Sequence, residues 1–370
     1  MMRIALVLPD LRFGGAERVV INLANSFISR GHSVDVVLMV ATGEFLHDLK
    51  SEIRVVDLKV GRIRSALLPL IRYFRQVRPD AVLAFMWPIT IISLWARVFA
   101  RVNTRVVVSE HTTWSRSELV SKFFIKWQIR ATMHLFFPKA DAIVAVSQGA
   151  ASDMASFAGI DIRTITYIYN PVVGVEKLFS AELSEPAEWW SGKHYKVLAV
   201  GALKDIKDYG TLLTAFAQLR KRHDARLLIL GEGECRLKLA AQVRSLGLES
   251  SVFMPGFRKD VSPYYHQADL HVLSSTGEGL GNVIIEALEA GTPVVSTDCP
   301  SGPREILQNG KFGRLVPVGD ASALALAMEA SLLGTHDRKA LKARAQDFSI
   351  EKAADQYEKL LIPSVSEGRQ

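Results

Sequence analysis

The sequence is poor in cysteine. Its 370 residues include two, Cys235 and Cys299, which lie far apart and form no Cys-x-x-Cys motif. This excludes a disulfide-rich scaffold and a cysteine zinc site, and it is typical of a protein from a reducing compartment. The chain also has no Asp-x-Asp motif and no group of His or Cys with metal-ligand spacing. We therefore expect neither a required metal nor a bound cofactor.

Long hydrophobic runs are missing as well. The longest, from Ala81 to Ala96, is interrupted by Pro88 and falls short of the ~20 residues that span a bilayer. The N-terminal stretch MMRIALVLPD is too short for a signal peptide. The sequence thus predicts a chain without a membrane-crossing segment.

Acidic residues are scarce in the first half of the chain. Over residues 1–180 there are 22 Lys and Arg against 14 Asp and Glu, whereas the remainder has 23 against 24. Two basic clusters, at 54–78 and 116–139, account for the excess. Aromatic residues are interleaved with the second cluster: Phe123, Phe124, Trp127, Phe136 and Phe137.

Basic residues beside aromatic rings suit an anionic membrane surface, where the rings lie at headgroup level and the charges meet phosphate. The alternative is a helix with an aromatic stripe facing the core and a solvated basic face. Nucleic acid is not an expected partner, because no recognised binding motif accompanies the charge.

Buried-strand patterns alternate with helical segments along the whole chain. The expected strands are RIALVLPD, SVDVVLMV, AVLAF, TRVVVSE and AIVAVS, followed by KVLAVGAL, RLLILGEG, SVFMPGF, LHVLSS and TPVVSTD. This alternation is typical of parallel sheets with right-handed crossovers, and the length exceeds what one core organises. The sequence predicts an α/β fold of two Rossmann-like, doubly wound domains, 1–170 and 193–345, joined by a linker at 171–192.

Candidate functional residues come directly after expected strands, where ligands bind in such sheets. These residues are Gly14, Gly15, Glu110, His111, Lys204, Lys207 and Glu278.

The stretch EGLGNVIIEALEAG, residues 278–291, carries two acids, Glu278 and Glu286, and no basic residue. Gly279, Gly281 and the amide of Asn282 open a helix here, and a helix N-terminus with glycines favours a phosphate. A glycosidase would need its carboxyls ~5 to 9.5 Å apart, but eight residues of helix rise ~12 Å. One acid is therefore expected to reach a sugar and the other a ribose, with a diphosphate between them.

A nicotinamide-dependent oxidoreductase is a competing class. It would need Gly-x-Gly-x-x-Gly after a strand. The stretch GEGLGN has glycines at 277, 279 and 281, which is the wrong spacing.

The segment EGLGNVIIE resembles the Glu-x7-Glu signature of glycosyltransferase family 4, the retaining nucleotide-sugar transferases of GT-B fold. The resemblance covers almost the whole chain. Further matching segments are GGAERVVINLA, VVVSEHT, VGALKDIKDYGTLLTAF, LLILGEGECRLKL, VFMPGFRKDV, GTPVVSTDCPSGPREIL and FSIEKAADQYEKLL. It implies that residues 346–370 form a helix that crosses back to the N-terminal, acceptor-binding domain, while the C-terminal domain binds the nucleotide sugar.

The resemblance also implies roles for individual residues of the nucleotide-sugar site. Glu286 would accept hydrogen bonds from ribose hydroxyls, Glu278 would hold donor-sugar hydroxyls, and Lys207 would neutralise charge on the leaving diphosphate. The amides that follow Glu278 would meet sugar and phosphate: Gly279, Leu280, Gly281 and Asn282.

Other roles follow for the base, the phosphates and the acceptor. The backbone around Phe257 and Arg258 resembles a base-binding turn, and Gly15 would approach the phosphates from the opposite domain. His111 resembles a histidine near the donor sugar and acceptor, although a solvated loop histidine is the alternative. Where the family usually has an arginine this chain has Ala202, and Lys204 could replace the lost charge as a point donor.

The resemblance implies a uridine diphosphate sugar as donor, with a hexose or N-acetylhexosamine to transfer. It also implies a polyprenyl-diphosphate-linked glycan as acceptor and a peripheral place on the inner face of the cytoplasmic membrane. The diphosphate itself would take the acceptor proton, because no protein nucleophile is well placed. A soluble acceptor, or a catalytically silent protein that binds sugar nucleotides, remains as an alternative.

Overall fold

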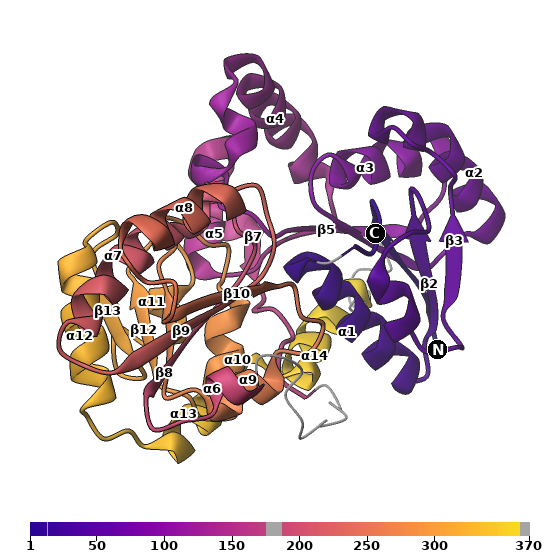
Figure 1. Ribbon diagram of the computed structural model, residues 1–370. Helices are drawn as coiled ribbons and strands as arrows, with labels where there is room; N and C mark the ends of the chain where they lie inside the picture. The colour runs from indigo at the N-terminus through magenta and orange to yellow at the C-terminus, as the bar shows by residue number, and fades with distance from the viewer. Residues whose placement is uncertain (13, 175–186, 363–370) are drawn as a thin grey trace. The chain divides into compact units, whose positions relative to one another are not determined.

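The computed structural model describes residues 1–12, 14–174 and 187–362, and two compact units divide the chain (Figure 1). The first unit is Met1–Val175 with Phe348–Gln370, and the second is Glu176–Asp347. Each unit has its own parallel sheet and its own hydrophobic core. The expected α/β architecture of two doubly wound domains is confirmed.

The first unit contains a seven-stranded sheet in the order β3-β2-β1-β4-β5-β6-β7, and all its neighbours pair in parallel. Its strands are β1 (Arg3–Leu8), β2 (Ser33–Leu38), β3 (Arg54–Asp57), β4 (Ala81–Phe85), β5 (Arg105–Glu110), β6 (Ala142–Ala145) and β7 (Ile165–Tyr167). Its α-helices are α1 (Gly15–Ser29), α2 (Leu67–Val77), α3 (Ile89–Ala100), α4 (Phe123–Phe136), α5 (Gln148–Ala158) and α14 (Ile350–Leu361).

The second unit repeats this order in a six-stranded sheet, β10-β9-β8-β11-β12-β13. Its strands are β8 (Tyr195–Val200), β9 (Ala225–Leu230), β10 (Val252–Gly256), β11 (Leu270–Leu273), β12 (Val294–Thr297) and β13 (Arg314–Val316). Its α-helices are α6 (Ala187–Trp190), α7 (Tyr209–Arg220), α8 (Arg236–Ser245), α9 (Ser262–Gln267), α10 (Asn282–Ala290), α11 (Pro303–Ile306), α12 (Ala321–Leu332) and α13 (Arg338–Ala345).

Short one-turn 3-10 helices complete both units. They are η1 (Glu44–Asp48), η2 (Ile63–Ala66), η3 (Trp114–Arg116), η4 (Glu118–Ser121), η5 (Phe137–Lys139), η6 (Ile162–Thr164), η7 (Asp205–Lys207) and η8 (Gln346–Phe348).

The sheet order explains why the central strands were visible in the sequence and three others were not. Strands such as β1, with its five consecutive buried residues, are covered on both faces and read as continuous apolar runs. The three strands missed by the sequence, β3, β7 and β13, all lie at sheet edges. Each is short and partly exposed, so its sequence lacks that run.

The terminal helix α14 is part of the first unit. It packs against α1 and against strands β4 and β5. The Ser349 side chain caps its N-terminus by accepting a hydrogen bond from the Lys352 amide. At its other end, Arg105 Nε donates to the Leu360 carbonyl at 2.6 Å.

Candidate functional site

The loop between β11 and α10 carries Glu278, and α10 begins at Asn282. Gly281 precedes the helix with φ +98°, a left-handed conformation that favours glycine. The first amides of α10 are therefore presented at a glycine-lined helix start, as the sequence predicted. Among the polar groups that such a start accommodates, an anion is the most favoured.

Glu278 forms an ion pair with Lys207. The Lys207 Nζ lies 2.6 Å from Glu278 Oε1, and the Ser275 hydroxyl donates to the same oxygen at 2.6 Å. The side chains of Lys207 and Glu278 are 20% and 11% exposed, so the pair is shielded but remains open to a ligand. Two of the predicted site residues are thus brought into direct contact.

The topology of the sheet accounts for this contact. Lys207 ends the short helix η7 after β8, and Glu278 follows β11. Strands β8 and β11 are neighbours, with Leu270 opposite Val197 and His271 opposite Leu198. The strand order reverses between these two strands, and ligands of doubly wound sheets bind outside the carboxyl ends at such a point.

A second loop supports the Glu278 segment from behind. The Glu278 amide donates to the Pro300 carbonyl at 3.4 Å. Gly302 lies so close to this segment that a Cβ there would be 1.8 Å from the Leu280 carbonyl oxygen. The glycine in the sequence CPSGP is therefore required by a close approach of two backbones.

The negative charge of Glu278 influences two buried neighbours. Burial and then the Glu278 carboxylate raise the pKa of Tyr209 above its ordinary value. The same two causes raise the pKa of the Cys299 thiol to about 12. Both groups therefore stay neutral at physiological pH, and Lys207 is the cation that pairs with Glu278.

Glu286 lies inside α10 and is half-buried. Burial and then the nearby Glu286 carboxylate raise the pKa of Tyr265, on α9, well above its ordinary value. The Tyr265 ring in turn packs edge-on against His271 of β11, with 5.3 Å between ring centroids. One signature acid is therefore paired with a lysine, and the other lies near a neutral tyrosine.

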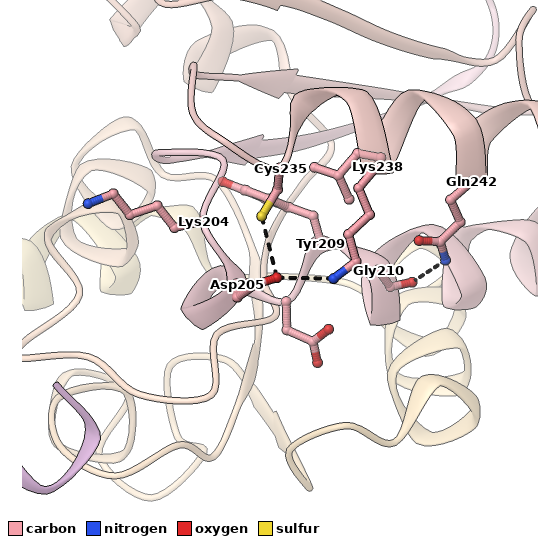
Figure 2. A pocket seen from close by; sticks show the side chains of 9 residues that line it. Lys204, Asp205, Tyr209, Gly210, Cys235, Lys238 and Gln242 are labelled. Atoms are coloured by element: carbon pink, nitrogen blue, oxygen red, sulfur yellow. Dashed lines mark hydrogen bonds and ion pairs between the residues drawn. The ribbon is translucent and has the colours of Figure 1, made fainter. Parts of the chain in front are cut away.

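Lys204 is exposed and lies at the rim of a small pocket on the second unit (Figure 2). Figure 2 shows its side chain pointing away from Asp205, which is bonded to Lys238 at 3.1 Å and to the Cys235 thiol at 3.4 Å. In the described parts of the chain, no acidic side chain pairs with Lys204. Its ammonium is available to an anion, as a substitute for the arginine absent at Ala202 requires.

Phe257 and Arg258 follow β10, at the edge of the sheet. Phe257 is 40% exposed. Arg258 Nη1 donates to the carbonyls of Pro255 and Phe257, at 3.0 Å each, so its guanidinium holds the turn together. The turn that resembles a base-binding site is thus braced by one of its own side chains.

The remaining predicted site residues belong to the first unit. Gly14 is the N-cap residue of α1 and Gly15 begins this helix, after the loop that follows β1. His111 follows β5, and its Nε2 lies 3.1 Å from the Ser109 hydroxyl. Burial lowers the pKa of His111 to about 4, so the ring is neutral at physiological pH. The His111 side chain is partly exposed, while its Nδ1 atom is buried.

Glu110, beside His111, is buried more deeply. It accepts hydrogen bonds from the Thr90 hydroxyl at 3.0 Å and from the Trp87 amide at 3.3 Å. Burial nevertheless raises the pKa of Glu110 to about 8, so the carboxyl keeps its proton at neutral pH. A buried and uncharged carboxyl therefore adjoins a partly buried and uncharged imidazole.

The aromatic residues of the second basic cluster divide between surface and core. On α4, Phe123, Phe124 and Trp127 are 83%, 76% and 61% exposed. Phe137, which follows α4, is buried, and Phe136 packs against Trp95. The alternative prediction, aromatic side chains that face the core, is therefore wrong for Phe123, Phe124 and Trp127 and confirmed for Phe137.

Sequence reasoning missed the side chains that hold the site residues. Ser275 precedes Glu278 by three positions in STGE, and this Ser-x-x-Glu spacing was a usable signal for their hydrogen bond. Ser109 alternates with His111 along an extended strand end, which places both on one side. Tyr357, whose hydroxyl lies 3.1 Å from Ser109 Oγ, comes from the terminal helix and gave no signal at all.

Within residues 1–12, 14–174 and 187–362, no three His, Cys, Asp or Glu side chains gather where they could hold a metal ion. The same described residues include no helix that is both long and apolar enough to span a bilayer.

Both units match known family models. The model described as Glycosyltransferase Family 4 matches residues 13–173, and the model described as Glycosyl transferases group 1 matches residues 194–333.

Similarity to individual proteins extends along most of the chain. The sequence is 30% identical over 363 residues to the N-acetylgalactosamine-N,N'-diacetylbacillosaminyl-diphospho-undecaprenol 4-alpha-N-acetylgalactosaminyltransferase of Campylobacter jejuni, covering 94% of each chain. It is 28% identical over 365 residues to the lipopolysaccharide core biosynthesis glycosyltransferase LpsE of Rhizobium meliloti, covering 94% of this chain and 96% of that one.

Solved structures agree in fold. HepE of Anabaena in complex with UDP-glucose superposes with a TM-score of 0.80 at 23% identity, covering 98% of this chain and 99% of that one. WaaG, a glycosyltransferase involved in lipopolysaccharide biosynthesis, gives a TM-score of 0.70 at 19% identity and covers 95% and 99%. With both units matched and a relative similar over nearly its entire length, the chain belongs to glycosyltransferase family 4 and has the GT-B fold.

Proposed function

We propose that this glycosyltransferase moves a hexose or N-acetylhexosamine from a UDP-sugar to a polyprenyl-diphosphate-linked glycan, with retention of the anomeric configuration. The observation that carries the proposal is the Lys207–Glu278 pair beside the glycine-lined start of α10. A cation next to a helix N-terminus suits a diphosphate, and a carboxylate at the same place suits sugar hydroxyls.

In the proposed step, the bond between the anomeric carbon and the diphosphate oxygen breaks, and its electron pair leaves with the diphosphate. Lys207 and the α10 amides stabilise the charge that grows on the departing oxygen. The acceptor hydroxyl oxygen bonds to the anomeric carbon on the same face, and its proton passes to the departing diphosphate oxygen. The step balances without a metal or a protein nucleophile.

Two similarities support the choice of substrates. The C. jejuni relative is named for transfer to a diphospho-undecaprenol-linked sugar, and the HepE structure was determined with UDP-glucose. Both point to the class of donor and acceptor proposed for this chain.

The peripheral location is proposed from α4. Its exposed rings lie beside Lys122, Lys126 and Arg130, which are all exposed too. Figure 1 shows α4 standing out from the rest of the first unit. An anionic bilayer on the cytoplasmic side, where a lipid-linked acceptor presents its diphosphate, fits both the rings and the charges.

The experiment that tests the function is a donor panel. The purified protein is incubated with each of several UDP-sugars and a lipid-linked glycan extract, and products are identified by mass spectrometry. We expect one donor to add a single sugar to the lipid-linked acceptor and release UDP. Release of no nucleotide with any donor would favour the catalytically silent alternative, and transfer to a water-soluble glycan alone would favour a soluble acceptor.

A further inference from the structure

We infer that Tyr357, on the terminal helix, fixes the tautomer and orientation of His111 through the hydroxyl of Ser109. This inference rests on the proposed role of His111 near the donor sugar and acceptor. Tyr357 and Ser109 would then be positioning residues for the transfer reaction, and α14 would contribute to the site without touching substrate.

The contacts form a continuous chain of hydrogen bonds inside the first unit. Tyr357 Oη lies 3.1 Å from Ser109 Oγ, and Ser109 Oγ lies 3.1 Å from His111 Nε2. Tyr357 and Ser109 are 1% and 0% exposed, so water does not compete for these bonds. The Phe85 ring packs against the imidazole, with 5.6 Å between centroids, and limits its rotation.

The position of Tyr357 is itself secured by its helix. Arg30 Nη1 binds Asp355 at 2.6 Å and Glu358 at 2.8 Å, and His32 Nε2 lies 2.9 Å from Glu358. These residues flank Tyr357 on α14 and tie it to the end of α1. The position of the Tyr357 hydroxyl is therefore fixed by the ion pairs of α14 as well as by the hydrogen bond to Ser109.

Counting the donors and acceptors selects one direction for this series of hydrogen bonds. Burial raises the pKa of Tyr357 to about 12 and lowers that of His111 to about 4, so both groups are neutral at physiological pH. If His111 Nε2 donated to Ser109, then Ser109 would donate to Tyr357, whose own buried proton would lack an acceptor among the described residues. The reverse direction satisfies both hydroxyls and His111 Nε2: Tyr357 donates to Ser109, and Ser109 donates to Nε2. It leaves only His111 Nδ1 without a partner among the described residues, whereas the first direction leaves both Nδ1 and the Tyr357 proton unpaired.

In that direction the His111 proton is on Nδ1. This atom is buried, and among the described residues it has no hydrogen-bond partner. A buried donor without an acceptor in the protein is the group that an oxygen of a ligand would complete, such as a sugar hydroxyl or a phosphate oxygen. The hydrogen bonds from Tyr357 through Ser109 to His111 thus keep Nε2 occupied as an acceptor and leave the Nδ1–H as a donor for the substrate.

The test uses the full-length protein labelled with ¹⁵N-histidine. Nuclear magnetic resonance of the histidine ring nitrogens is combined with kinetics. Comparison with a His111→Gln variant assigns the signals. We expect Nδ1 to be protonated in the wild type, and the population to shift toward Nε2–H in both Tyr357→Phe and Ser109→Ala. We also expect kcat to fall by about 10- to 100-fold, the loss typical when the partner that orients a metal-binding histidine is removed, with little change in KM for the donor.

The matched control is Tyr73→Phe. Tyr73 is another buried tyrosine of the first unit, and its hydroxyl donates to Asp35 at 2.6 Å. This change removes a hydrogen bond of similar burial, so it should lower the stability while leaving the His111 tautomer and kcat unaltered. In a His111→Ala background, Tyr357→Phe should lower kcat no further.

Protonation at Nε2 in the wild type, or an unchanged tautomer in both variants, would overturn the inference. A shifted tautomer with unchanged kcat would overturn the link to sugar transfer. Failure of the proposed function can be distinguished from failure of this inference. If the function fails, the wild type transfers no sugar, but the tautomer measurement still tests the hydrogen bonds from Tyr357 to His111.

Discussion

Lys207 and Glu278 form a partly buried ion pair, with 2.6 Å between Nζ and Oε1, and they come from loops that follow neighbouring strands. Without a ligand, each neutralises the other. An arriving diphosphate would share Lys207 with Glu278, while sugar hydroxyls would donate to the carboxylate. The pair is therefore suited to a ligand that carries both a negative charge and hydroxyl groups.

The first prediction concerns the two signature acids. Glu286→Ala should weaken UDP binding by about tenfold to a hundredfold, because hydrogen bonds to a charged group contribute about 1.5–3 kcal/mol. Glu278→Ala should leave UDP affinity nearly unchanged and mainly lower turnover, because its proposed partner is the sugar. Isothermal titration calorimetry with UDP, beside kinetics with the UDP-sugar, measures both effects. An equal loss of affinity in the two variants would refute this division of roles.

The second prediction concerns Lys207. Lys207→Ala should lower kcat by about 100- to 1000-fold, as expected when a group that stabilises transition-state charge is removed. Glu278 keeps its bond from Ser275, so the fold should persist, and this can be verified by thermal unfolding. The control is Lys238→Ala, which removes an exposed lysine that pairs with Asp205 in the same unit. Similar losses of kcat in both variants would show that removing any positive charge from this unit lowers turnover, so that Lys207 has no specific role.

The third prediction concerns α4 and the membrane. Replacing Lys122, Lys126 and Arg130 with glutamate should abolish flotation with anionic liposomes, since each basic residue near such a surface contributes about 1 kcal/mol. Binding by the wild type should also weaken with added salt, because exposed charges are screened.

The flotation experiment has a matched control in the second unit. Replacing the exposed Lys221, Lys339 and Lys342 with glutamate makes the same change in net charge elsewhere on the protein. Flotation that is indifferent to anionic lipid, or lost equally in both triple variants, would remove the membrane proposal and leave the transferase proposal intact.

The fourth prediction is a pH dependence of stability caused by Glu110. Its pKa is about 8 in the folded protein and 4.5 as the ordinary value, so between these values the folded state binds more protons. The free energy of unfolding should fall as pH rises through this window, by at most about 1.4 kcal/mol per pH unit. His111 and His271, whose pKa values are lowered to about 4 and about 3, act in the opposite direction below pH 6.5.

Between pH 6.5 and 8, the contribution of Glu110 is therefore no longer opposed by these histidines. Over that interval Glu110→Gln should gain about 1 to 2 kcal/mol of stability relative to the wild type. Urea unfolding of both proteins at several pH values measures the difference. A constant difference across the interval would mean that Glu110 is already ionised in the folded protein.

The residue pattern alone predicts the repeated strands and helices, the division into two units and the loops that carry the candidate residues. It does so because central parallel strands are buried on both faces and must be continuously apolar, as in β1 and β9. It also identified Glu278, Glu286 and Lys207, since local motifs and glycines mark the places where strands end and helices begin. Edge strands such as β3 were not predicted, because an exposed strand does not need to be continuously apolar.

Which of these residues meet depends on packing between segments that are distant in the chain. That Lys207 touches Glu278 follows from the pairing of β8 with β11, and strand order is set by crossover packing that local sequence does not record. That Tyr357 reaches Ser109 follows from α14 packing against β5, a contact between segments far apart in the chain. Burial, and with it the raised pKa of Glu110 and the lowered pKa of His111, depends on everything that surrounds a group, so it too belongs to the fold.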